Sequence, residues 1–129
     1  MEDKKTLVKL WMEYGDRDLH TAEIIHAHAS EYSDMIGFHC QQAVEKYIKA
    51  YLIFLNIEFP NTHNLTLLLD LVKDKADFKE DFSEQANELK VFAVEVRYPL
   101  GKVDLSTIDL NNKIKTANDF RTEIVARIK

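Results

Sequence analysis

The polar residues of segment 41–50 have the types and the spacing needed to bind an anion. Gln42, Lys46 and Lys49 follow one another at intervals of four and three residues, which places them on one face of a helix. Amide and ammonium groups donate hydrogen bonds without needing a shifted pKa, so this face suits a phosphate or a carboxylate. The alternative is a solvated surface on which Glu45 and Lys49 form an ion pair worth about 0.2–0.5 kcal/mol. Composition alone favours this second interpretation.

Two further polar positions lie near expected helix ends. His63 falls in a loop before a helix start, where an imidazole could cap the helix or face a ligand. Arg97 comes just before a proline, where it could stabilise the last carbonyls of a helix, the favoured interpretation, or reach a phosphate. The candidate ligand-binding residues are Gln42, Lys46, Lys49, His63, Arg97 and Tyr98.

The other chemically capable residues do not form a recognisable catalytic or metal site. The chain has five histidines: His20, His26, His28, His39 and His63. They do not form the His-Glu-x-x-His pattern of zinc enzymes. Cys40 has no Cys/His/Asn arrangement around it and is expected to be a small core residue. Glycine-rich phosphate loops and Gly-x-Ser-x-Gly are absent, so we expect no catalytic residue, no metal and no cofactor.

Helices must position these side chains, because apolar residues recur at three- and four-residue steps along most of the chain. Gly15 predicts a mild kink or a late helix start at Asp16. Ser33 and Asp34 are expected to cap the second helix, and Thr62 or Asn64 the third. The fourth helix begins at residue 81 or 83, and its half 91–96 is read as helix because a lone strand would have no partner. The predicted helices cover residues 7–29, 34–55, 65–75, 81–98 and 110–128.

These elements predict an all-α fold. Only three Gly and two Pro occur in 129 residues, which is typical of long helices with few interruptions. Short connections favour antiparallel neighbours, and a chain of this length forms one core. We therefore expect a single domain over residues 1–129, an antiparallel up-and-down helical bundle of about five helices, four long and one short.

Charge and hydropathy restrict the partners. A formal net charge of −5 argues against general electrostatic binding to nucleic acid, although a local basic patch remains compatible with it, and no DNA binding is expected. No apolar run approaches the roughly 20 residues that span a bilayer, so no membrane partner is expected. The first residues lack the apolar stretch of a signal peptide, and the single cysteine cannot form an intrachain disulfide. These features predict a cytoplasmic protein.

Four segments, in chain order, resemble the motifs of the HEPN domain family. Together they span roughly residues 7–126, and their order along the chain is more specific than any one of them. The family usually has Asp at the position of Asn64. The matching residues are Trp11 with Arg17-Asp18-Leu19 and Ala22; Gln41-Gln42-Ala43-Val44-Glu45-Lys46 with Lys49-Ala50; Pro60 with Thr62-His63-Asn64-Leu65 and Leu68-Leu69; and Arg97-Tyr98-Pro99.

The resemblance implies an antiparallel helical bundle that commonly dimerises and is often paired with a minimal nucleotidyltransferase. For that branch a nucleotide-binding role has been proposed, whereas other members are metal-independent endoribonucleases with an Arg-x4–6-His motif. In this sequence the positions five to seven after Arg97 are Lys102, Val103 and Asp104, and no other arginine has a histidine at that spacing. RNA cleavage of this kind needs an imidazole, so the nuclease branch is disfavoured.

The favoured hypothesis is therefore a noncatalytic, homodimeric HEPN-type binding module. Its ligand would be a nucleotide, another phosphate-bearing molecule or RNA. It would bind a nucleotidyltransferase partner instead of this ligand or in addition to it, as in a toxin–antitoxin pair. One alternative is a metal-independent endoribonuclease with an atypical active site, in which His63 or a partner protomer supplies the imidazole. A third hypothesis is a structural dimer scaffold whose two-fold interface is formed by exposed apolar residues such as Trp11 or Phe120.

Overall fold

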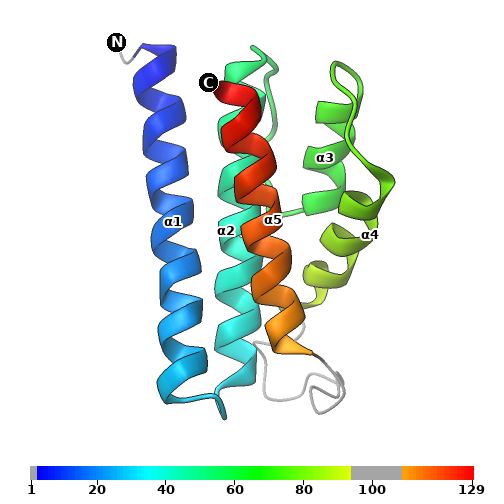
Figure 1. The fold of residues 1–129 in the computed structure, drawn as a ribbon. Helices are drawn as coiled ribbons and strands as arrows, with labels where there is room; N and C mark the ends of the chain where they lie inside the picture. Colours follow the sequence, from blue (N-terminus) through cyan, green and yellow to red (C-terminus); the bar gives the residue numbers. More distant parts are fainter. Residues whose placement is uncertain (1–2, 94–108) are drawn as a thin grey trace.

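The computed structural model describes residues 3–93 and 109–129, and within these ranges all regular structure is helical. Figure 1 shows the three longest helices side by side, with α1 running opposite to α2 and α5. The shorter helices α3 and α4 form an antiparallel pair on the side of the bundle away from α1 (Figure 1). No helix in the described ranges is long and apolar enough to cross a membrane. The elements are α1 Lys4–His28, α2 Ser33–Phe54, α3 Leu65–Lys73, α4 Glu80–Leu89, the 3-10 turn η1 Lys90–Phe92 and α5 Leu110–Ile128.

These elements confirm the all-α bundle, with differences in length. The helices α1, α2 and α5 have 25, 22 and 19 residues, whereas α3 and α4 have only 9 and 10. Three helices are therefore long and two are short in the described ranges, where four long and one short were expected. The start of α4 at Glu80 is earlier than predicted, and the expected helical segment 94–98 lies outside the described residues.

Helix α1 continues without interruption through Gly15, so the predicted kink or late start is wrong. This glycine allows close packing: a Cβ at position 15 would lie 2.6 Å from Cε1 of Tyr47, which is far too close for two carbon atoms. The missing side chain therefore lets the Tyr47 ring lie directly against the backbone of α1. The sequence predicted a conformational role for Gly15, and the structure gives it a packing role.

Helix α2 lies at the centre of the bundle and packs against α1, α3, α4, η1 and α5. Of its 22 residues, 13 are buried, so no broad face of the helix is left for solvent. Glu45 and Lys49 are only 3% and 4% exposed, which contradicts the interpretation of this segment as a solvated polar surface. The structure also assigns the N-cap of α2 to Tyr32, without a side-chain cap hydrogen bond, and not to Ser33 or Asp34.

Aromatic rings join the α3–α4 side of the bundle to α5. The Phe82 ring lies edge-on to those of Phe78 and Phe120, with centroids 4.9 and 4.7 Å away. Phe120 is fully buried in this cluster. The hypothesis that Phe120 is exposed at a dimer interface is therefore wrong, and Trp11 is itself half-buried against the core.

Candidate ligand-binding site

A cluster of polar side chains lies inside the bundle, on the side of α2 that faces the loop before α3. Gln41, Glu45 and Lys49 follow at four-residue intervals, which aligns them along one side of the helix, and all three are buried. One carboxylate oxygen of Glu45, Oε2, accepts a hydrogen bond from Lys49 Nζ at 3.0 Å. The other, Oε1, accepts a longer one from Gln41 Nε2 at 3.4 Å. A buried charge needs such partners, because an unpaired one costs several kcal/mol.

His63 completes this group, which we call the Glu45 cluster (Gln41, Glu45, Lys49 and His63). Its Nδ1 lies 2.9 Å from Glu45 Oε1, and its backbone carbonyl accepts a hydrogen bond from Gln41 Nε2 at 3.1 Å. Because a carboxylate only accepts, Nδ1 carries the hydrogen, and in the neutral ring Nε2 is the free acceptor. The side chain of His63 is 67% exposed. Glu45 therefore orients an imidazole whose other nitrogen has no partner among the described residues.

The residues on either side of His63 hold its loop in place. The backbone N–H of Asn64 donates to Thr62 Oγ1 at 3.2 Å. Asn64 Oδ1 in turn accepts from the N–H of Leu67 at 3.2 Å, which makes Asn64 the N-cap of α3. Of the two caps expected from the sequence, Thr62 and Asn64, the structure has Asn64. The position of the imidazole is thus fixed by a buried carboxylate on one side and by a helix cap on the other.

A pocket of about 300 Å³, which we call the His63 pocket, opens beside this loop. Its volume is at the lower end of the range of about 300–1,000 Å³ for small-molecule sites. The described lining residues offer an imidazole, an ammonium, a hydroxyl and an amide, but no carboxylate. Its ammonium group belongs to Lys90, which is exposed and forms no ion pair with any described residue. The residues that line this pocket are Thr62, His63, Asn64, Lys90 and Ala93.

The structure places Lys46 on a different side of α2, facing α1. Its Nζ forms a short ion pair with Oδ2 of Asp18, whose other oxygen lies 2.9 Å from Nδ1 of His39. A shallow hollow of about 290 Å³ opens here, lined by Tyr14, Arg17, Asp18, Thr21 and Lys46. Because Asp18 neutralises Lys46, this hollow attracts an anion less strongly than an unpaired lysine would.

The remaining predicted residues have different surroundings. Lys49 lies over the rings of Trp11 and Phe59, at 5.4 and 5.8 Å from their centroids, so it supports Glu45 from inside the bundle and does not face a ligand. Gln42 is half-buried and forms no hydrogen bond with a described residue. The other two predicted residues, Arg97 and Tyr98, lie outside the described residues. Of the four that the structure describes, only His63 lines the His63 pocket.

A second polar cluster, which the sequence did not reveal, joins the three long helices. Tyr47 Oη donates to Asp16 Oδ1 at 2.7 Å, and Arg121 donates to the same carboxylate through Nε at 2.7 Å and Nη2 at 3.3 Å. Burial, and then the hydrogen bond to Asp16, raise the pKa of Tyr47. Arg121 is 105 residues from Asp16, so no local spacing pattern could have indicated this contact.

Cys40 does not form a reactive centre, and the described ranges contain no cluster that could hold a metal ion. Cys40 is fully buried, as expected for a core residue, and burial raises the pKa of its thiol to about 12. The thiolate is therefore scarce at neutral pH, and a cysteine in this state is a poor nucleophile. Residues 3–93 and 109–129 contain no group of three or more His, Cys, Asp or Glu side chains that could hold a metal ion.

Comparison with known proteins agrees with this architecture. The model of the HEPN domain family matches residues 8–128, nearly the whole chain, so the protein belongs to the HEPN domain family. The structure is also similar to the crystal structure of an archaeal HEPN homologue, with a TM-score of 0.74 over 95% of this chain and 98% of that chain. The two sequences are 24% identical, so this likeness shows a shared fold. A comparison with curated proteins finds no match.

Proposed function

We propose that the protein is a noncatalytic HEPN-type binding module whose His63 pocket holds a phosphate-bearing ligand such as a nucleotide. The observation that carries this proposal is the set of residues that line the pocket: they bear an imidazole, an ammonium, a hydroxyl and an amide group, and no described lining residue is acidic. In a chain with a formal net charge of −5, such a pocket differs in charge from the molecule as a whole. Its donors match the oxygen atoms of a phosphate.

Each group has a distinct part in this proposal. Lys90 supplies a positive charge that no described carboxylate neutralises. His63 supplies an oriented imidazole: its Nδ1 is held by Glu45 at 2.9 Å, which leaves Nε2 for the ligand. The Glu45 carboxylate that holds the ring is buried, whereas the imidazole itself is largely exposed. From membership of the HEPN family we further propose a homodimer that acts together with a nucleotidyltransferase partner.

Titration of the protein with ATP, followed by calorimetry, tests the ligand proposal. We expect saturable binding that His63→Ala and Lys90→Ala each weaken about 10- to 150-fold, since a hydrogen bond to a charged group contributes about 1.5–3 kcal/mol. His28→Ala and Lys75→Ala are the matched controls, because both side chains are exposed and neither lines the His63 pocket. Lys46→Ala is a third comparison on the α1 side of α2. Lack of saturable binding of ATP, GTP and inorganic phosphate would overturn the proposal.

One observation favours a second function, metal-independent cleavage of RNA. A buried carboxylate that orients an imidazole with a free Nε2 is the arrangement a general acid or base requires, and Glu45 and His63 have this geometry. If this function holds, the purified protein cleaves RNA in EDTA, and His63→Gln abolishes cleavage while His28→Gln does not. Intact RNA after prolonged incubation with the wild-type protein in EDTA would exclude it.

A further inference from the structure

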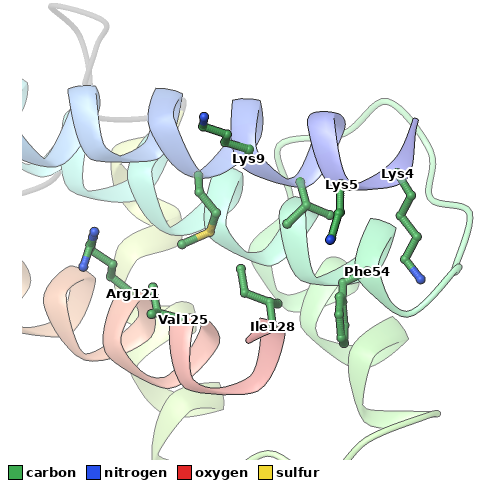
Figure 2. Close-up of a pocket in the computed structure, with 9 residues that line it drawn as sticks. Lys4, Lys5, Lys9, Phe54, Arg121, Val125 and Ile128 are labelled. Carbon is green, nitrogen blue, oxygen red and sulfur yellow. The ribbon is translucent and has the colours of Figure 1, made fainter. Parts of the chain in front are cut away.

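A groove separate from the His63 pocket runs between the first half of α1, the last half of α5 and the end of α2 (Figure 2). Its volume is about 570 Å³, well inside the range of about 300–1,000 Å³ for small-molecule sites. None of the residues considered in the sequence analysis as ligand-binding candidates lines it. The groove therefore has no role in the function proposed above.

The floor of the groove is apolar. Val8 and Met12 of α1 are each 8% exposed, and they face half-buried side chains from α5 and from the end of α2. Figure 2 shows Phe54, Val125 and Ile128 on the far side of the groove from α1. Such a surface favours the apolar part of a ligand, because contact removes hydrocarbon from water on both sides.

The rim of the groove is basic. Lys4, Lys5 and Lys9 of α1 line it, and none of the three forms an ion pair with a described residue. Lys4 lies over the Phe54 ring at 5.1 Å, and Figure 2 shows Lys4 and Lys5 reaching from α1 toward Phe54. Arg121 also lines the groove, but Asp16 already holds its guanidinium. Three lysines without described ion pairs therefore border one apolar floor.

Two of these lysines occupy positions that do not stabilise helix α1. Lys4 and Lys5 lie in the first turn, which contains no acidic residue, and cations there oppose the positive end of the helix dipole. The N-cap carboxylate of Asp3 is engaged by the N–H of Thr6 at 2.7 Å and forms no ion pair with a described lysine. Because Asp3 already caps the first turn of α1, the attraction for an anion bound in the groove comes from the lysines.

We propose that this groove binds a single-chain amphiphile with an acidic head group, of the fatty-acid type. The hydrocarbon chain would lie on the apolar floor, and the carboxylate or phosphate head would lie beside Lys4 and Lys5, which Figure 2 shows on the groove side of α1. Both the volume and the charge separation favour the small ligand.

Titration with decanoate below its micelle concentration, monitored by calorimetry, tests this proposal. We expect saturable one-to-one binding, and affinity that rises about two- to fourfold per methylene from octanoate to dodecanoate, since full burial of one CH₂ corresponds to about fourfold. The double variant Lys4→Gln/Lys5→Gln should bind about fivefold more weakly, because an exposed ion pair contributes up to about fivefold in affinity. Ile128→Ser should reduce the dependence on chain length, while Lys75→Gln, away from the groove, should change nothing.

Three results would overturn the proposal. The first is equal affinity for decyltrimethylammonium, which would show that the lysines do not select an anion. The second is binding to phosphatidylglycerol vesicles without saturable binding of free decanoate, which would assign the groove to a membrane surface. The third is a dimer in light scattering that Ile128→Asp converts to a monomer, which would show that a second copy covers the groove. His63→Ala should leave decanoate binding unchanged, so this test is independent of the ATP test.

Discussion

Nδ1 of His63 lies 2.9 Å from Oε1 of Glu45, so a side chain that is 67% exposed is held by one that is only 4% exposed. This contact joins the loop before α3 to the centre of the bundle. The same carboxylate binds Lys49 on its other oxygen at 3.0 Å, and the Lys49 ammonium lies over the rings of Trp11 and Phe59. The geometry of the His63 pocket therefore depends on a charged pair buried in the core.

Breaking this buried pair should be strongly destabilising. We expect Glu45→Gln to lower the free energy of unfolding by roughly 3 kcal/mol, because Lys49 would keep a buried charge without its counter-ion. The double variant Glu45→Gln/Lys49→Met should recover most of that loss, since it removes both charges and conserves volume. Urea denaturation measures both values. Equal stability of wild type and Glu45→Gln would contradict the buried ion pair.

Gly15→Ala tests the close contact between α1 and α2. Alanine is a better helix former by about 1 kcal/mol, yet the added Cβ would lie 2.6 Å from Cε1 of Tyr47. The ring cannot move freely, because its hydroxyl is bonded to Asp16. We expect a net destabilisation of about 1–3 kcal/mol, seen as a lower thermal midpoint. Stabilisation of the variant would mean that the two helices are farther apart.

Asn64→Ala removes the N-cap of α3 and should lower stability by about 1 kcal/mol. Asn64 also restrains the loop that carries His63. ATP affinity should therefore fall together with stability, although the His63 side chain itself is unchanged. Thr66→Ala, at the second residue of α3, is a matched control that keeps the cap. A variant that loses stability but keeps full ATP affinity would separate the loop from ligand binding.

The raised pKa of Cys40 leads us to expect that the free energy of unfolding depends on pH in the alkaline range. Its pKa is raised by burial from 9.0 to about 12, so the folded state keeps the thiol protonated where the unfolded state loses the proton. The resulting contribution to stability is complete below pH 9 and is lost progressively as the pH rises toward 12. Denaturation of wild type and Cys40→Ala at pH 8, 9 and 10 should show a steeper decline for the wild type. Parallel curves would exclude an ionisation difference at this residue.

The sequence allowed the long helices to be predicted because their apolar residues repeat at the helical period. The predicted range 110–128 coincides with α5, and Asn64 was one of the two caps expected from polar residues before the apolar run of α3. The burial of Lys49 could not be predicted from the helical period, because the rings that cover it, Trp11 and Phe59, belong to segments outside α2. Local spacing describes which side chains share a face of a helix, but not what covers that face.

The same limit explains the candidate site. His63 stood out because it precedes a helix start, whereas Lys90 looks in sequence like any exposed lysine and joins the pocket only through the packing of η1 near the loop. Glu45 was interpreted as half of a surface ion pair with Lys49, and that pair exists at 3.0 Å. Its burial and its third partner, His63, depend on how α2 is enclosed by the other helices.

The central position of α2 gives the Glu45–Lys49 pair a further consequence for folding specificity. Apolar side chains surround this helix and can exchange neighbours at small cost, so hydrophobic packing alone tolerates several rotations of α2 about its axis. A charged pair at one angular position does not tolerate them, because any rotated arrangement separates the Glu45 carboxylate and the Gln41 amide from His63, which lies outside the helix. We infer that the pair selects one orientation of α2. Glu45→Gln/Lys49→Met would then stay folded but show broadened NMR resonances, and sharp native-like spectra would contradict this inference.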